Sequence, residues 1–254
     1  MRIIKTFLEH PLTRGLSVDD PRTTLLRREI IRNKQFLSSL YSEWYATIIS
    51  ALPANSWNVL ELGSGAGFLQ QYLPNVITSE VFMTRGVRLI ASACDLPLPP
   101  QSLDAIVMTD VFHHIPDVDR FLNEATRCVR PGGKIVMIEP WRTGWSEWIY
   151  THLHPEPFLP EAGWELPLSG PLSGANGALP WIVFERDRDR FESSHPQWQI
   201  KKIKPIMPVA YLLSGGVSMR GLMPGWMYKP IRCIERILFP SSWGMFAFIE
   251  LQHN

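Results

Sequence analysis

The first fifth of the chain carries a helical pattern of hydrophobic positions. Pro21 suits the first turn of a helix, and no Gly or Pro follows it until Pro53. Apolar residues recur near the helical period or twice that period, at Leu26, Ile30, Leu37, Leu40, Trp44 and Ile48. The pattern predicts one long helix over residues 19–51.

From Trp57 onward, short apolar runs alternate with helical segments. The runs predict strands over 57–62, 76–80, 87–91, 105–109 and 135–138. A short helix is expected over 68–73. A longer one is expected from Pro116–Asp117 onward, ended by the turn Arg130-Pro131-Gly132-Gly133. Alternating strands and helices joined by short turns predict an α/β fold with a doubly wound parallel sheet.

After Pro140 the amino-acid composition of the sequence changes. Eight of the ten tryptophans lie at or beyond Trp141, and Pro and Gly crowd residues 155–180, which favours an ordered loop or lid. Helices are expected over 178–193 and 228–238, and strands over 199–206 and 245–251. The chain is therefore divided into a helical cover (1–52), a Rossmann-like core (53–140), an aromatic lid or substrate-recognition insertion (141–198) and a completion of the sheet (199–254).

Composition limits the kinds of partner that the protein could bind and the cell compartment in which we expect it. The formal net charge of +1 gives no electrostatic footprint for nucleic acid, which ranks low as a partner. The three cysteines lack metal-ligand spacing, so we expect buried, reduced thiols in a cytoplasmic protein. No apolar run reaches the roughly 18 to 20 residues of a membrane span, although peripheral membrane contact stays open.

The segment Val59-Leu60-Glu61-Leu62-Gly63-Ser64-Gly65-Ala66-Gly67 is the most informative in the sequence. A strand ends near an acidic residue, and three alternate glycines then let the backbone turn tightly and approach a ligand closely. A dinucleotide fingerprint needs a further glycine where Phe68 stands. The loop thus favours a nucleoside with an amino-acid tail over a pyrophosphate.

On these residues the chain resembles the class I S-adenosylmethionine-dependent methyltransferases, in particular the small-molecule, type 11-like group. The resemblance covers about 80 residues and implies a seven-stranded sheet with an antiparallel last strand. It implies S-adenosyl-L-methionine as cofactor, bound by Glu61, Gly63, Ser64, Gly65 and Gly67. It also implies that Glu80, at the end of the second strand, bonds the ribose hydroxyls; the alternative is a solvated strand-end carboxylate.

Further motifs follow in the family's order. Ser92-Ala93 takes the place of the family's Asp-Ala at the adenine, with a serine hydroxyl as a weaker acceptor than a carboxylate, and Asp95 is expected in a turn. Asp110, at the end of the fourth strand, takes the position beside the methionine portion of the cofactor. The six residues after Glu80 are too few for the family's second crossover helix.

Candidate chemistry concentrates at His113 and His114. Histidine titrates near neutral pH, so one of them is a candidate general base facing the methyl group; a packing or cofactor-orienting role is the alternative. We do not expect a metal site. Glu139 is a candidate base or substrate anchor, or else a cap or solvated residue. Tyr41, Trp44 and Tyr45 lie in the helical cover, where helical spacing favours a core role over ligand contact.

The sequence therefore predicts transfer of a methyl group to a small-molecule or lipid-linked acceptor, at oxygen. The alternative is a catalytically silent relative acting as a partner or binding subunit, and a nucleotide-dependent oxidoreductase is disfavoured by Phe68. The apolar run from Tyr211 to Met227 is interpreted as a dimer contact or a landing site for a lipid-linked acceptor.

Overall fold

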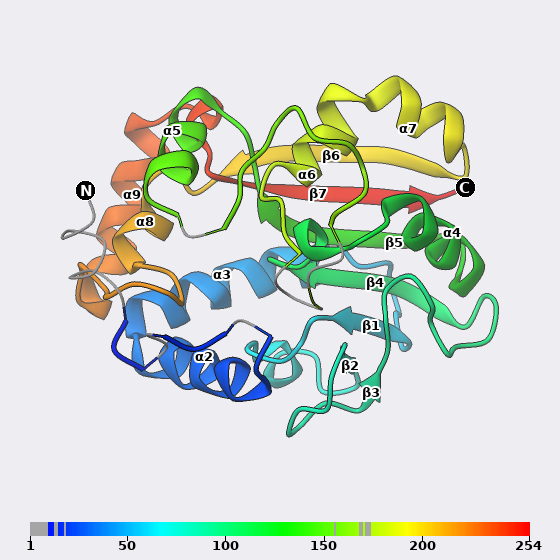
Figure 1. Ribbon diagram of the computed structural model, residues 1–254, viewed down its shortest axis with the longest axis horizontal. Helices are drawn as coiled ribbons and strands as arrows, with labels where there is room; N and C mark the ends of the chain where they lie inside the picture. Colours follow the sequence, from blue (N-terminus) through cyan, green and yellow to red (C-terminus); the bar gives the residue numbers. More distant parts are fainter. Residues whose placement is uncertain (1–9, 13–14, 18, 155, 168–169, 171–173) are drawn as a thin grey trace.

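A single mixed sheet organises the molecule. The structure is a computed structural model that describes residues 10–12, 15–17, 19–154, 156–167, 170 and 174–254. Within these residues seven strands form one sheet in the order β3-β2-β1-β4-β5-β7-β6 (Figure 1). In chain order they are β1 (Val59–Leu62), β2 (Ile77–Glu80), β3 (Leu89–Ile90), β4 (Leu103–Thr109), β5 (Val129–Pro140), β6 (Trp198–Ile206) and β7 (Phe246–His253).

The strand directions confirm the predicted fold class. β1 pairs in parallel with β2 and with β4, and the parallel pairing continues to β3 on one side and to β5 on the other. β7 runs antiparallel to both β5 and β6. The central strand β4 is buried along almost its whole length, as expected for a parallel strand covered on both faces.

Helices flank this sheet. They are α2 (Pro21–Asn33), α3 (Gln35–Ala51), α4 (Val118–Cys128), α5 (Gly144–His152), α6 (Leu179–Trp181), α7 (Arg188–Ser194), α8 (Ala210–Ser214) and α9 (Tyr228–Leu238). Single turns of other helix types are η1 (Leu69–Gln71), η2 (Phe112–His114), η3 (Ile182–Arg186), η4 (Gly225–Met227) and η5 (Ser241–Trp243). The predicted helix over 228–238 is confirmed, and that over 178–193 is interrupted by the π-helical turn η3.

The prediction of one helix over residues 19–51 was wrong, because the chain breaks at Lys34 between α2 and α3. Lys34 leaves helical geometry, and its Nζ donates to the carbonyl oxygens of Gly216 (2.6 Å) and Met219 (2.7 Å). Lysine is a good helix former, so nothing in the local sequence marks the break. Contacts with a segment some 180 residues away stabilise it.

Two connections in the core depart from the predicted pattern. The helix expected to end at Arg130-Pro131-Gly132-Gly133 ends at Cys128, and these four residues lie inside β5, where the pairing with β4 is irregular. The expected helix over 68–73 is only the turn η1. Between β2 and β3, residues 81–88 contain no helix, in agreement with the short spacing in the sequence.

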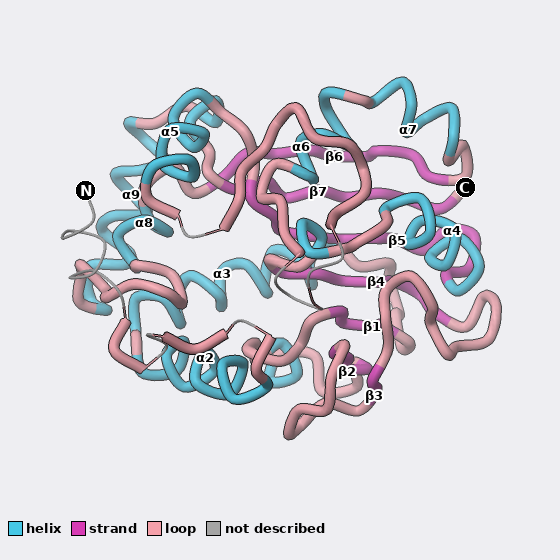
Figure 2. The backbone as a smooth tube through the Cα atoms, in the orientation of Figure 1, coloured by secondary structure: helices cyan, strands magenta, loops and turns pink. Residues whose placement is uncertain are grey.

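The predicted lid is largely loop, as Figure 2 shows between α5 and α6. Part of it (155, 168–169 and 171–173) lies outside the described residues. The rest is tied to the core: Asn176 N donates to His113 O (2.9 Å), and Leu166 N donates to Pro116 O (2.9 Å). The segment is therefore ordered where it crosses the ends of the parallel strands. Within the described residues, no helix is long and apolar enough to cross a membrane.

Candidate cofactor and acceptor site

The glycine loop after β1 is shaped by contacts with β2. Ser64 N donates to Ser79 O (2.9 Å), and Gly63 has a positive φ of 66°, which a glycine adopts without strain. Gly65 N donates to Glu80 Oε1 (3.0 Å), and a Cβ at Gly65 would overlap that carboxylate oxygen and approach Thr24 Cγ2 within 2.5 Å. The loop therefore requires glycine at position 65 to bring β1, β2 and α2 together.

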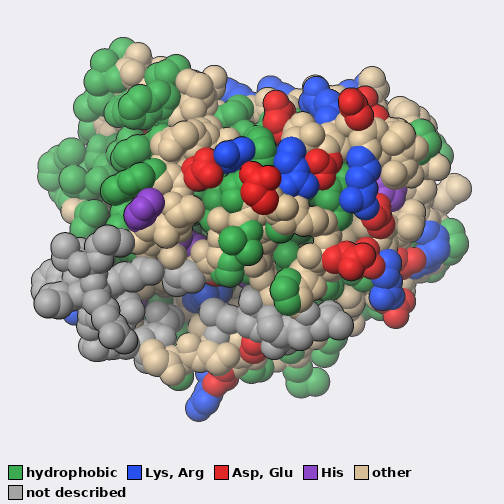
Figure 3. Space-filling model, turned by 45° about the horizontal axis from the view of Figure 1, so that its top comes forward, with side chains coloured by type: hydrophobic (Ala, Val, Ile, Leu, Met, Phe, Trp, Pro, Cys, Tyr) green, Lys and Arg blue, Asp and Glu red, His purple; other side chains and the backbone are tan. Residues whose placement is uncertain are grey.

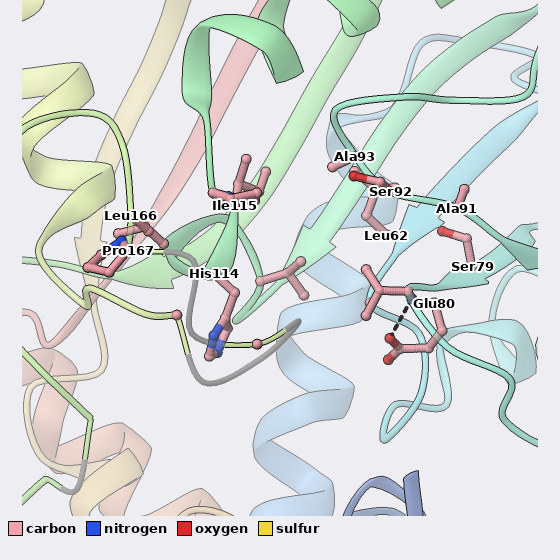
Figure 4. A pocket seen from close by; sticks show the side chains of 16 residues that line it. Leu62, Ser79, Glu80, Ala91, Ser92, Ala93, His114, Ile115, Leu166 and Pro167 are labelled. Atoms are coloured by element: carbon pink, nitrogen blue, oxygen red, sulfur yellow. Dashed lines mark hydrogen bonds between the residues drawn. The ribbon is translucent and has the colours of Figure 1, made fainter. Parts of the chain in front are cut away.

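A cavity of about 540 Å³ lies beside this loop. Its walls include three of the residues predicted to bind adenosine: Glu80, Ser92 and Ala93 (Figure 4). Glu80 Oε2 also accepts a hydrogen bond from Val81 N (3.1 Å). Burial raises the pKa of Glu80, and the two backbone hydrogen bonds oppose that rise. The carboxylate is thus fixed at the cavity wall, where it can accept hydrogen bonds from hydroxyl groups.

The adenine-side residues lie in a tight turn. Asp95 N donates to Ser92 O (3.1 Å), and Ser92 Oγ accepts from Cys94 N (3.2 Å). The side chain of Asp95 is exposed and is not part of the cavity wall. Ser92 and Ala93 are therefore the members of this motif that face the cavity.

A second, smaller cavity of about 100 Å³ adjoins the first and shares Gly63, Glu80 and His114 with it. Glu61 and Asp110 line it, and burial raises the pKa of Glu61 to about 7 and that of Asp110 to about 6. Asp110 has a positive φ of 62°, and its N–H donates to Ile138 O (2.9 Å), so strand pairing holds it in this conformation. The cavity is an acidic compartment suited to a cationic group.

The helical cover supplies the other wall of the second cavity. Tyr41, Tyr45 and Arg27 all line it, and Tyr45 Oη accepts a hydrogen bond from Phe68 N (3.1 Å). Tyr41 and Tyr45 are buried in the aromatic core as well, so the two roles weighed for them coexist; Trp44 is part of the core. Arg27 forms no hydrogen bond or ion pair with any described residue. Sequence reasoning missed it, because one arginine in a helix gives no motif.

His113 is held between two carboxylates. Its Nδ1 lies 2.9 Å from Glu139 Oε2, and its Nε2 lies 3.4 Å from Glu156 Oε2. Burial alone would lower the pKa of His113, but the hydrogen bonds to Glu139 and Glu156 outweigh burial and raise this pKa well above its ordinary value. His113 is therefore an imidazolium in the core and forms no part of the walls of the cavities described above.

Glu139 organises the turn that carries both histidines. It is fully buried, and its Oε1 accepts hydrogen bonds from Val111 N and Phe112 N, each at 2.8 Å. Of the roles considered for Glu139, the capping role fits best, although the N–H groups it caps belong to η2 rather than to the segment after Trp141. Glu156 was not singled out from the sequence, because its neighbours Pro155 and Pro157 give a loop pattern only.

His114 differs from His113 in lining all three cavities of this site. Figure 4 shows its imidazole pointing into the first cavity, across from Ser79 and Glu80. Burial and the neighbouring His113 lower the pKa of His114 to about 3, so the ring is neutral. Its Nδ1 is buried and has no hydrogen-bond partner among the described residues. This ring nitrogen is therefore buried without a partner among the described residues, in a side chain that lines the cavity.

A third cavity, of about 70 Å³, is also lined by His114 and shares Arg27, Asp110 and Val217 with the second. Its remaining walls come from α5, from α8 and the turn after it, and from Glu156. No tryptophan is among the described residues that line these three cavities, but the predicted lid forms part of two walls: Leu166, Pro167 and Gly174 line the first cavity, and Ile149, Tyr150 and Glu156 line the third. Trp141, Trp164 and Trp198 are buried.

The histidines also bear on metal binding. Ligand atoms of His113, His114 and Glu156 lie within 4.8 Å of one another. In this arrangement His113 is already engaged at both ring nitrogens by carboxylates, and its charge compensates theirs. The ion pairs account for the cluster without a metal.

Comparison with known proteins identifies a methyltransferase segment within the chain. Residues 60–137 match the methyltransferase domain family. They form a class I methyltransferase domain. The chain is 25% identical over 169 residues to a demethylmenaquinone methyltransferase of Thermobifida fusca, covering 55% of this chain and 60% of the relative. It is 29% identical over 106 residues to an uncharacterized methyltransferase of Mycobacterium tuberculosis, covering 36% and 42%. The chain thus spans about half the length of these relatives.

Solved structures agree in fold. Geranyl diphosphate C-methyltransferase from Streptomyces coelicolor, solved with S-adenosyl-L-homocysteine, superposes with a TM-score of 0.52 at 12% identity, over 97% of this chain and 92% of that chain. An S-adenosylmethionine-dependent methyltransferase structure from Listeria monocytogenes, itself described as putative, gives 0.51 at 11% identity, over 84% and 98%. At these identities the likeness concerns the fold. S-adenosylmethionine is the cofactor of this class, as predicted from the sequence.

Proposed function

We propose that this protein transfers a methyl group from S-adenosylmethionine to an oxygen atom of a small-molecule or lipid-linked acceptor. The observation that carries the proposal is the meeting of three cavities at His114. One has the residues for a nucleoside, the second is acidic, and the third lies against α5 and α8. These three environments match the parts of S-adenosylmethionine and its acceptor. The first suits the nucleoside, the second suits the cationic centre and the amino-acid tail, and the third suits the acceptor.

The residues present fit the cofactor. Glu80 would accept from the ribose hydroxyls, and Ser92 and Ala93 would border the adenine. Asp110 and Glu61 would lie beside the cationic centre and the amino group, and the guanidinium of Arg27, which has no partner among the described residues, would bind the carboxylate of the tail. When bound, the cofactor supplies a sulfonium methyl that is already electrophilic. The protein therefore mainly has to orient the acceptor and exclude water.

His114 has the chemistry to position an acceptor hydroxyl. Its neutral ring and free Nδ1 can accept the hydroxyl hydrogen, which directs the oxygen lone pair. Transfer of the methyl carbon from sulfur to the acceptor oxygen would break the carbon–sulfur bond, release the thioether and make the hydroxyl strongly acidic, so even a base with a pKa of about 3 could take its proton. A carboxylate acceptor needs no proton removal. His113 packs against His114, since the centroids of the two rings lie 4.2 Å apart with the ring planes tilted by 42°.

The first experiment is calorimetric titration of the protein with S-adenosylmethionine and S-adenosylhomocysteine, with NADH as control. Micromolar binding of the first two alone is expected. Turnover is then followed by transfer of labelled methyl to hydroxyl and carboxyl acceptors. His114→Ala should lower kcat about 100-fold or more and leave cofactor affinity within a factor of two, whereas the exposed His152→Ala should change neither. Cofactor binding without turnover on any acceptor would favour the silent-subunit alternative.

A further inference from the structure

Helix α9 buries charged side chains and exposes apolar ones, which is the reverse of an ordinary surface helix. Its inward face carries Tyr228, Arg232 and Glu235, all buried, at positions i, i+4 and i+7. Its outward face carries Ile234 and Ile237, which are 51% and 74% exposed. A surface helix normally buries its apolar residues and exposes its charges. Among the described residues, the arrangement therefore leaves Ile234 and Ile237 on the outward face of α9 exposed.

The buried charges of α9 are fully engaged, so the orientation of the helix is well defined. Arg232 Nη2 donates to Glu43 Oε1 (2.6 Å), and Arg232 also pairs with Glu235. Glu235 Oε1 accepts from Ala210 N (2.8 Å) and Val209 N at the start of α8, and Tyr228 Oη donates to Glu43 (2.6 Å). Turning the helix to bury its isoleucines would leave these charges unpaired in the core, which is costly.

The apolar face of α9 continues onto its neighbours. Trp226 precedes the helix and is 74% exposed, and Leu238 ends it at 68% exposed. Phe239 then contacts Trp243 (ring centroids 5.7 Å apart), and Trp243 stacks on Trp145, which stacks on Trp148 of α5. We call this the α9–α5 surface: Trp148, Trp226, Ile234, Ile237, Leu238 and Trp243. Figure 3 shows hydrophobic side chains gathered at the end of the molecule where α5 and α9 lie.

On the α8–α9 side of this surface the exposed charges are of one sign, whereas on α5 Glu147 is paired with Arg142. Between residues 210 and 244 the chain contains a single acidic residue, Glu235, and it is buried. Arg220, Lys229 and Arg236 in the same stretch are exposed. A symmetric dimer through this surface would place the same basic residues of two copies against each other. Anionic headgroups complement them, and tryptophan with aliphatic side chains is the composition that enters the headgroup boundary.

We infer that the α9–α5 surface docks the protein on the surface of an anionic lipid bilayer. The helix would lie along the membrane with Trp226, Ile237 and Trp243 in the headgroup region. The third cavity is built from α5 and α8, which adjoin this surface. Resting on the proposed function, the docking would therefore bring that cavity to the membrane and select an acceptor with a lipid tail.

The test is co-sedimentation of the full chain with vesicles made of equal parts of phosphatidylglycerol and phosphatidylcholine. Neither cofactor nor acceptor is added, so failure of the proposed methyl transfer would leave this result unaffected. The wild-type protein should pellet with these vesicles, and less with pure phosphatidylcholine or at high salt. Trp226→Gln and Ile237→Gln should each lower the partition coefficient about 10-fold.

Trp57→Gln is the matched control, because Trp57 is 70% exposed but belongs to the segment before β1. It should leave the partition coefficient unchanged, and unchanged S-adenosylhomocysteine affinity should show that all three variants are folded. Failure of the wild-type protein to pellet would overturn the inference, as would an equal loss with Trp57→Gln. Light scattering that reports a dimer dissociated by Ile237→Gln, without vesicle binding, would instead identify a second copy as the occupant.

Discussion

Replacing Glu139 by glutamine probes the buried pair that holds the histidine turn. The substitution keeps one side-chain oxygen for Val111 N and Phe112 N, but places an amide where His113 Nδ1 now meets a carboxylate oxygen at 2.9 Å. The lost interaction is that of a buried charge with its partner. Breaking such a buried pair lowers the free energy of unfolding by about 3 kcal/mol or more. We expect the lower value because the hydrogen bonds from Val111 N and Phe112 N are kept. For a chain of this size the melting temperature should fall by about 6–12 °C.

The pH dependence makes this prediction more specific. His113 has a folded-state pKa well above its ordinary value of 6.5. The stability that it contributes is therefore fully present below pH 6.5 and is lost as the pH rises through the folded-state pKa. The difference in melting temperature between wild type and Glu139→Gln should be largest near pH 6 and shrink toward alkaline pH.

Thermal denaturation followed by circular dichroism at several pH values measures both effects. Glu192→Gln is the control, since Glu192 is an exposed carboxylate on α7. A loss at Glu139 no larger than that at Glu192 would refute the claim that the pair is energetically coupled. A pH-independent difference between wild type and Glu139→Gln would show that His113 is neutral in the folded protein.

Three further predictions concern the cofactor site. Gly65→Ala should weaken S-adenosylmethionine binding at least about 10-fold, because the added Cβ would displace Glu80. Gly144→Ala is the control and should leave the affinity unchanged, because a Cβ there meets nothing within 4 Å. Equal affinities of the two variants in calorimetry would contradict this prediction. Gly67→Arg should abolish binding, because even a Cβ there meets Tyr45 Oη at 2.6 Å; unchanged affinity would remove the loop assignment. The pKa of Asp110 is about 6, so its carboxyl group loses its proton between pH 5 and 8. Over this range the affinity for S-adenosylmethionine relative to that for S-adenosylhomocysteine should rise, by about 10-fold for each unit by which the bound sulfonium lowers the pKa of Asp110. Asp110→Asn should flatten that pH profile.

The sequence by itself determined the fold class and predicted candidate residues for the cofactor side of the site. Strand periodicity and the glycine loop are local signals, because a parallel strand must be apolar on both faces and a close backbone approach needs glycine. The family resemblance that these motifs carry predicted the seven-stranded sheet, which is confirmed. It also singled out Glu61, Gly63, Glu80 and Asp110, which the structure places around two adjoining cavities.

The tertiary structure decided what depends on partners distant in the chain. The break at Lys34 depends on carbonyl groups near residue 217, and the placement of His113 depends on Glu139 and Glu156. The inverted orientation of α9 depends on Glu43, whose carboxylate binds Arg232 and Tyr228. In each case a buried charge needs a partner, and that partner lies at a sequence separation which no local periodicity records.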